Sequence, residues 1–459
     1  MNEAYAEKLR KTHTLVWLFL GMMVYKFSMD LAYLYLTEVF GYVLSFNPLK
    51  YTLGLVWCVV LFVFIRHTEH RVSSFFLYYI FLFQIVPITS VYALGDHSTA
   101  YYALLCLSFL LCELTVGHTG ERPLFRRNLI VSRTMTLCFG IGAAAVLLNI
   151  IWKNGAPHLS LLNIYTVYEY RSSGAFQIGK YMNYILTWTI FVYLPLGLAR
   201  ALTKRSYSRT LLMGGLMVLL YLYTGHKSML FGAPFVILLT LWARRKHCYQ
   251  ELFLSGCCGF SIVTMLTYFS EPGSLWYHIN NLFTRRVMLL TAQNKFLYYD
   301  YFSNRPKLGI YGLFPTWIVK IPSYYEGVNI THDISSIYYD KPDMGTNTGF
   351  FAEGYARFGY IGIILLLLLF ALLLKQTDRL QDRVGYQLAV GIFVYPVLNL
   401  TDGFLLDSLV FGPWTWLTAI LLFYMIKTAP PRPRPAGALP RISLRGGGGP
   451  RRTGIQCEK

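Results

Sequence analysis

An acid and a base one helical turn apart stand at the entrance of a very apolar segment. In the stretch NTGFFAEGYARFGYIGIILLLLLF, residues 347–370, Glu353 and Arg357 come just before an aliphatic run. In a helix that begins near Gly349, the i, i+4 spacing puts both side chains on one face, close enough to pair. A carboxylate there could orient or deprotonate a hydroxyl group, while the guanidinium neutralises it or binds phosphate. The alternative is a purely structural pair at a helix start.

A tight turn between two apolar runs adds a third charge. In YTGHKSML, residues 223–230, Gly225 allows close backbone approach, and Ser228 could cap the following helix, whose free N–H groups favour an anion. The neighbouring Lys227 would then contact a phosphate group. The alternative for Lys227 is an ordinary lysine at the membrane interface.

Further cations and proton-transfer candidates lie in two predicted outer loops. LFTRRVMLL places Arg285 and Arg286 in an apolar, helix-like context, where paired guanidiniums could bind a diphosphate or simply anchor the helix to headgroups. Arg171, in YEYRSSG, is a further cationic candidate for the diphosphate. His332 and Asp333, in NITHDISS, could transfer protons or form a surface turn. Together these residues indicate a site for a lipid-linked phosphate.

Metal and cofactor chemistry has no counterpart in the sequence. The cysteines form no CxxC or Cys/His ligand spacing, no acidic cluster suggests a divalent ion, and Walker A, GxSxG and HExxH motifs are absent. We therefore expect a metal-independent protein without a cofactor.

Composition places the chain in the membrane class. Of its 459 residues, 55% are hydrophobic, 17% aromatic and only 14% charged. The net charge of +19 would suggest nucleic acid in a soluble protein. Here the basic residues concentrate in short loops such as GERPLFRRN and ARRKH, as the positive-inside rule predicts for cytoplasmic loops. We expect both termini to be cytoplasmic and no nucleic-acid partner.

The apolar runs predict an all-α, polytopic protein with about 12 transmembrane helices. They lie near residues 14–36, 50–65, 73–94, 99–115, 129–152, 181–201, 209–223, 227–242, 250–269, 358–374, 386–400 and 404–426. In the first of them, Lys26 and Asp30 have i, i+4 spacing and are expected to pair.

Four regions follow from this pattern. Residues 1–270 hold helices one to nine, with a smaller outer loop at 153–180. Residues 271–357 form a large extracytoplasmic loop between the ninth and tenth spans, with eight Lys/Arg against seven Asp/Glu and the pattern of amphipathic helices lying on the membrane. Residues 358–426 hold the last three spans. The tail, 427–459, is rich in Pro, Gly and Arg and is predicted to be disordered.

The order of these features resembles the bacterial polysaccharide repeat-unit polymerases, the Wzy or O-antigen polymerase family. The TGHKS turn is similar to that family's Gly-Ser/Thr-Arg turn, with Lys227 where arginine is usual. The pattern Glu-x-Tyr-x-x-Phe-Gly-x-x-Gly, in Glu353, Tyr355, Phe358, Gly359 and Gly362, also looks family-like. The resemblance covers roughly residues 150–375.

The resemblance implies a GT-C-like membrane glycosyltransferase in the bacterial inner membrane. Its substrates would be undecaprenyl-diphosphate-linked glycans, joined at the outer membrane face to make O-antigen, capsule or exopolysaccharide. Glu353 and His332 would be catalytic, and Arg285, Arg286, Lys227, Arg171 and Arg357 would bind the diphosphate. Membrane lipids, a flippase and a chain-length regulator would be partners. An O-antigen ligase, or a flippase of lipid-linked oligosaccharide, is the alternative.

Overall fold

The computed structural model describes most of the chain up to residue 410. The described residues are 3–40, 42–65, 71–117, 129–163, 166–167, 170, 173–245, 247–271, 273–314, 319–342 and 344–410. The predicted tail, most of the last predicted span and Arg171 lie outside these ranges.

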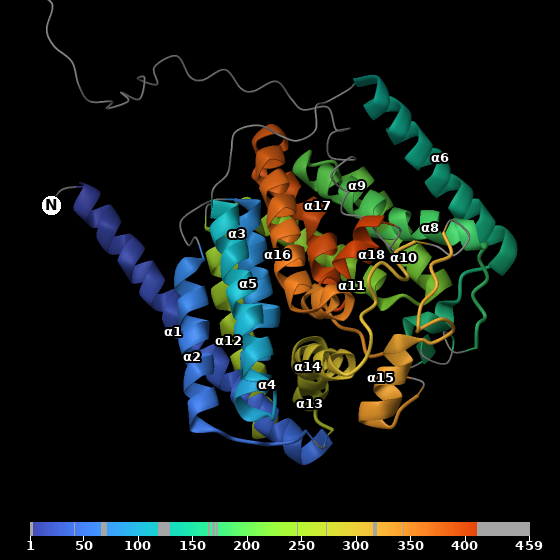
Figure 1. Ribbon diagram of the computed structural model, residues 1–459. Helices are drawn as coiled ribbons and strands as arrows, with labels where there is room; N and C mark the ends of the chain where they lie inside the picture. The colour runs from blue at the N-terminus through green and yellow to red at the C-terminus, as the bar shows by residue number, and fades with distance from the viewer. Residues whose placement is uncertain are drawn as a thin grey trace, which may run out of the picture. The chain divides into compact units, whose positions relative to one another are not determined.

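Every regular element in the described part of the chain is a helix (Figure 1). In order, the helices are α1 (Glu3–Phe40), α2 (Pro48–Phe64), α3 (Val72–Ile80), η1 (Phe81–Ile85), α4 (Val86–Leu94), α5 (Thr99–Gly117), α6 (Leu129–Asn154), η2 (Leu159–Leu162), α8 (Lys180–Trp188), η3 (Thr189–Tyr193), α9 (Leu194–Thr203), α10 (Tyr207–Thr224), α11 (Lys227–Trp242), α12 (Cys248–Tyr268), α13 (Leu275–Asn280), η4 (Asn281–Leu289), α14 (Leu290–Ser303), α15 (Ile330–Tyr339), α16 (Phe350–Val384), α17 (Tyr386–Asn399) and α18 (Leu405–Val410). The all-α prediction is confirmed for these residues.

Within the described ranges, six helical stretches are long and apolar enough to cross a membrane. They are His13–Tyr35, Val72–Leu94, Thr99–Gly117, Tyr181–Thr203, Cys248–Tyr268 and Phe350–Gln381. Four more of the predicted spans coincide with shorter apolar helices: Pro48–Phe64, Gly140–Asn154, Met229–Trp242 and Tyr386–Asn399. The run at 209–223 lies in α10, and the run at 404–426 extends past the described residues. The helices indicate a membrane-embedded, polytopic protein.

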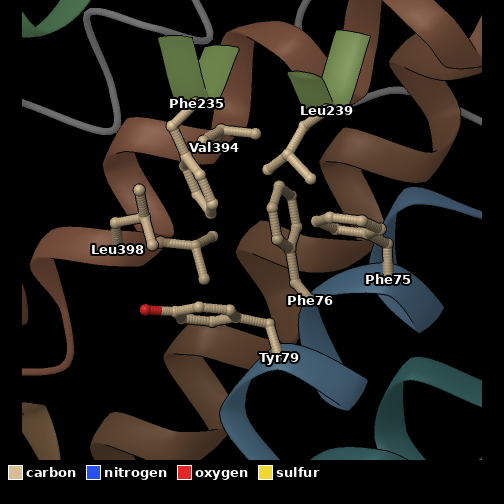
Figure 2. A pocket seen from close by; sticks show the side chains of 8 residues that line it. Phe75, Phe76, Tyr79, Phe235, Leu239, Val394 and Leu398 are labelled. Atoms are coloured by element: carbon tan, nitrogen blue, oxygen red, sulfur yellow. The ribbon is translucent and has the colours of Figure 1, made fainter. Parts of the chain in front are cut away.

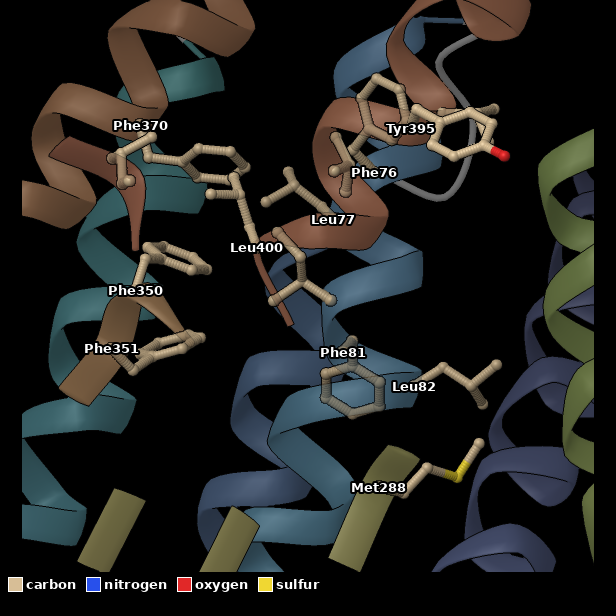
Figure 3. Packing of buried hydrophobic residues seen from close by; sticks show 14 of the residues in the cluster. Phe76, Leu77, Phe81, Leu82, Met288, Phe350, Phe351, Phe370, Tyr395 and Leu400 are labelled. Atoms are coloured by element: carbon tan, nitrogen blue, oxygen red, sulfur yellow. The ribbon is translucent and has the colours of Figure 1, made fainter. Parts of the chain in front are cut away.

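Long helices pack along one another around a continuous apolar core. α1 packs along α12, α5 along α16, α9 along α10 and α11 along α17. Figure 3 shows part of this core, where Phe350 and Phe370 of α16 approach Leu400, which follows α17. The Phe350 and Phe370 ring centroids are 5.0 Å apart. Because aromatic side chains bury large areas, such contacts fix how the segments of α16 lie against α17.

The large loop does not consist only of surface helices. α14 packs against α4, α15 and α16, beneath the bend of α16 (Figure 1), and nine of its 14 residues are buried. It thus differs from the amphipathic helix expected on the membrane surface. The cause is its sequence, LTAQNKFLYYDYFS, which spreads aromatic residues around the helix and leaves no continuous polar face.

Candidate functional site

Helix α16 is two helices joined at a glycine hinge. Gly359 has φ 67° and ψ −151°, a conformation essentially restricted to glycine, and separates a short arm, 350–358, from a long arm, 360–384. A Cβ atom on Gly354 would lie 2.8 Å from the carbonyl oxygen of Gly362. The backbones of the two arms therefore touch, and the short arm folds back along the long arm. Gly354, Gly359 and Gly362 therefore make this hairpin possible.

The short arm carries the ion pair that its spacing predicts. Arg357 Nε donates to Glu353 Oε1 at 2.9 Å, and the exposed fractions of the two side chains are 2% and 0%. The guanidinium also donates to Asp407 Oδ1 at 2.6 Å, and to the carbonyl oxygens of Gly309 and Tyr311 at 3.2 and 2.8 Å. Arg357 thus joins α16, α18 and the large loop.

The Glu353 carboxylate binds the start of α18. It accepts hydrogen bonds from the backbone N–H groups of Leu405 at 2.5 Å and of Leu406 at 3.2 Å. A carboxylate at a helix N-terminus satisfies free N–H groups and complements the helix dipole. Both Glu353 oxygens are already engaged, so the geometry points to a positioning residue, and its role as a base stays a prediction.

A second buried charge lies on α14. The Lys295 ammonium is fully buried and donates to the carbonyl oxygens of Thr291 at 3.0 Å and Thr401 at 3.5 Å. No carboxylate among the described residues lies within ion-pair distance of it. Burial lowers its pKa to about 7, opposed by the charge of Asp402. A buried lysine with a lowered pKa is typical of a functional site.

Asp402 lies in the turn between α17 and α18, close to Lys295. Its side chain is reached by solvent, yet surrounding protein raises its pKa to about 6, opposed by the nearby Lys295 ammonium. We call Lys295, Glu353, Arg357, Asp402 and Asp407 the interior polar cluster.

An apolar recess adjoins this cluster. Side chains of α3, α11 and α17 surround a small cavity of about 10 Å³: Phe75, Phe76, Tyr79, Phe235, Leu239, Val394, Val397 and Leu398 (Figure 2). The Tyr79 ring forms one edge, and its hydroxyl interacts with Thr401 and lies near the Asp402 charge. The recess and the cluster therefore meet at Tyr79.

The turn that contains Lys227 lies at the same height along the helix bundle as the interior polar cluster. Gly232 lies against the Tyr395 hydroxyl and Gly391 against Thr240, so α11 and α17 run antiparallel. Lys227, the first residue of α11, is therefore level with the end of α17 near Leu400. This register brings the α11 N-terminus to the level of the interior polar cluster.

The smaller outer loop packs on the same turn. Its Tyr170 hydroxyl donates to the Tyr223 carbonyl oxygen at 2.8 Å, and the Tyr221 hydroxyl donates to that of Leu161 at 2.6 Å. Arg171 itself is not among the described residues. Tyr170 itself lies beside the end of α10.

The remaining predicted site residues lie in other parts of the large loop. Arg285 and Arg286 belong to the π-helix η4, where Arg285 donates to Asn281 and its charge acts on Tyr42 and Tyr339. His332, on α15, interacts through Nδ1 with the Pro342 carbonyl oxygen at 2.7 Å. These contacts are separate from those of Arg357.

Sequence reasoning overlooked Lys295. The residue was visible as a lone lysine in the aromatic run NKFLYYDYF, but an amphipathic surface helix would have left its ammonium in water. Asp402 and Asp407 were visible as acids flanking a turn, yet only the packing of that turn against α14 and α16 makes them part of a site.

Comparison of the chain with protein-family models, with curated proteins and with solved structures finds no match.

Proposed function

We propose that this protein is a membrane glycosyltransferase that polymerises undecaprenyl-diphosphate-linked repeat units at the outer face of the bacterial inner membrane. The proposal includes 12 spans, cytoplasmic termini and a GT-C-like arrangement. The observation that carries it is the interior polar cluster: Lys295 and Arg357 lie buried in an apolar helical bundle. Ionisable groups are costly at such positions, so they indicate a functional site. The glycine-hinged Glu353 to Gly362 pattern supports the family assignment.

In the proposed reaction, the C1–O bond between donor glycan and diphosphate breaks while a hydroxyl of a second lipid-linked unit attacks C1. The departing diphosphate gains negative charge, which nearby cations stabilise without a metal. Lys295 is our first candidate for this role because its ammonium has no carboxylate partner at ion-pair distance among the described residues. Lys227 would assist from the α11 N-terminus, and the roles of Arg171, Arg285 and Arg286 stay predictions.

The attacking hydroxyl must lose its proton during the reaction. Asp402 is the candidate base, since it is reached by solvent and lies near Lys295. With a pKa of about 6 it accepts a proton readily near neutral pH. Glu353 would position Arg357 and the start of α18, and Asp407 would hold the other side of the guanidinium. A role for His332 in proton transfer stays a prediction.

A flippase for the same lipid-linked sugars is the second candidate. The break at Gly359 and the turn between α17 and α18 interrupt helices, as transporters do around their substrate sites. An O-antigen ligase, with the same donor but a lipid A acceptor, is the third.

A strain that lacks this protein distinguishes the three candidate functions: polymerase, ligase and flippase. Loss of a polymerase leaves one repeat unit on the lipid acceptor. Loss of a ligase leaves no repeat unit there, and lipid-linked polymer accumulates outside. Loss of a flippase also leaves none, but single lipid-linked units accumulate in the cytoplasmic leaflet. A ladder of normal length in the deletion strain would rule out the polymerase.

Topology tests the same proposal independently. Reporter fusions at Arg205 and Arg245 should report a cytoplasmic location, and a fusion at Asn304, after α14, should report the outside. A cytoplasmic reporter signal at Asn304 would place the site on the side of nucleotide sugars and contradict polymerisation at the outer face.

A further inference from the structure

Four tyrosines gather around the hinge of α16. Tyr101 of α5 stacks on Tyr299 of α14 with ring centroids 4.5 Å apart, and Tyr299 lies 4.7 Å from Tyr355. The Tyr355 and Tyr360 rings, on either side of Gly359, are 5.2 Å apart. We call Tyr101, Tyr299, Tyr355 and Tyr360 the tyrosine platform.

Hydroxyl groups line the accessible side of this platform. The Tyr299 and Tyr360 hydroxyls are 2.9 Å apart, and the Tyr355 hydroxyl lies 3.1 Å from Ser303 Oγ. Tyr101 and Tyr355 are buried and Tyr299 is partly buried, whereas Tyr360 is 46% exposed and Ser303 is also exposed. The accessible part of the platform is therefore the Tyr360 ring together with the Tyr299 and Tyr360 hydroxyls, supported from beneath by the buried rings.

Charged side chains surround the rings. Lys307 Nζ lies 4.1 Å from the Tyr355 ring centroid, and the Asp300 carboxylate follows Tyr299 directly on α14. Asp96, with 82% of its side chain exposed, lies near Asp300. Burial and the charge of Asp96 raise the pKa of Asp300 to about 6, although its side chain is solvent-accessible.

We propose that the tyrosine platform is a glycan-binding subsite. Sugar rings present apolar C–H faces that pack on aromatic rings, and hydroxyl edges that pair with tyrosine hydroxyls, carboxylates and ammonium groups. A lipid acyl chain, the alternative occupant, would form no favourable contacts with the charged side chains of Asp96, Asp300 and Lys307. The occupant rests on the proposed function: it is the oligosaccharide of the acceptor or growing chain.

The platform lies across the short arm from the ion pair. Tyr355 and Arg357 are two positions apart in a helix, so their side chains leave it about 200° apart. The two surfaces are therefore separated by about one helix diameter, roughly 10 Å. In this proposal, a sugar on the platform lies across the short arm from Arg357 and holds the chain while the next bond forms.

The test measures oligosaccharide binding to the full-length protein in lipid nanodiscs. The probe is free oligosaccharide of at least two repeat units, released from the cell's own surface polysaccharide. We expect Tyr360→Ala to weaken binding roughly 2- to 10-fold, the effect of one aromatic contact. Tyr360→Phe keeps the ring and should retain most of the binding. Tyr324→Ala, at a tyrosine that is 71% exposed elsewhere in the large loop, is the matched control and should bind as the wild type does.

Equal binding by wild type and Tyr360→Ala would overturn the proposal, as would the absence of binding to the wild type. Binding to vesicles of anionic lipid that depends on Tyr360, without oligosaccharide binding, would identify an interfacial aromatic belt instead. The proposed function is judged separately: if the deletion strain keeps normal chains while Tyr360-dependent binding persists, polymerisation fails and the subsite stands. If both the polymerase function and the glycan-binding subsite are correct, Tyr360→Ala should shorten the polysaccharide chains at a normal level of the protein.

Discussion

Two buried ion pairs in this chain have the same i, i+4 spacing but very different surroundings. In α1, Lys26 Nζ lies 2.5 Å from Asp30 Oδ1, and the Tyr51 hydroxyl of α2 donates to Asp30 Oδ2 at 2.9 Å. In α16, Glu353 and Arg357 add bonds to the start of α18, to Asp407 and to two carbonyl oxygens of the large loop.

The difference shows that i, i+4 spacing predicts an ion pair but does not predict how many other segments the pair contacts. The pair in α1 joins two helices through one hydroxyl. The pair in α16 holds three separate segments through charge-assisted hydrogen bonds, which are stronger than neutral ones. Removing one partner there would leave several buried groups unsatisfied at once, and each such group costs about 1–3 kcal/mol.

Exchanging the charges should separate the two pairs most strongly. Glu353→Arg with Arg357→Glu would turn a cation toward the N–H groups of α18 and a carboxylate toward Asp407, so we expect loss of activity and a large fall in thermal stability in detergent. Lys26→Asp with Asp30→Lys should be far better tolerated. Equal tolerance of both exchanges would contradict the wider network around Arg357.

Substitution at the glycine hinge of α16 should reduce activity nearly as much as the charge exchange in the Glu353–Arg357 pair. In Gly354→Ala, the new Cβ would meet backbone atoms of the long arm at 2.7–2.8 Å, so we expect the arms to separate, with loss of chain growth. Gly214→Ala is a matched control, since a Cβ on that α10 glycine meets no atom within 4 Å. Normal chain length with Gly354→Ala would show that the arms need not touch.

The stability that Lys295 contributes should depend on pH, because this lysine is buried without a carboxylate at ion-pair distance among the described residues. Because the pKa of Lys295 falls to about 7 on folding from an ordinary value near 10.5, the unfolded chain binds more protons between those pH values. Stability from this residue is therefore complete above about pH 10.5 and is lost as pH falls toward 7.

The rise in unfolding temperature between pH 7 and pH 9 should accordingly be smaller in Lys295→Met than in wild type. Lys341→Met, at an exposed lysine, should behave as wild type. The same rise in Lys295→Met and wild type would show that the Lys295 ammonium stays charged throughout.

The smallest effect should come from removing the first pair completely. Lys26→Met with Asp30→Leu exchanges a buried ion pair for apolar side chains, a change often neutral within about 1 kcal/mol or stabilising. We expect near-normal unfolding temperature and normal chain length. Loss of chain growth at unchanged stability would show instead that Lys26 and Asp30 take part in function.

Sequence patterns predicted the helical class, the membrane-type helices and both i, i+4 pairs, because each depends on local periodicity or composition. The fold-back of α16 was not predicted, although Gly354, Gly359 and Gly362 were visible, since a glycine permits a left-handed conformation without requiring it. The interior polar cluster depends on contacts between α14, α16 and the turn before α18, which are about 50 to 110 residues apart in the chain. Local patterns carry no information on such contacts.

The short arm of α16 has a consequence for membrane insertion. Its nine residues, 350–358, would extend about 14 Å as a helix, roughly half of a bilayer's hydrocarbon thickness. A segment so short, with two charged side chains, cannot partition into lipid as an independent span. The long arm must enter first, and the short arm then docks against it and α5 once Asp407 and the α18 N–H groups are in place to receive its charges. Assembly of the polar cluster is therefore a late, post-insertion step, completed only after the C-terminal part of the chain has been synthesised.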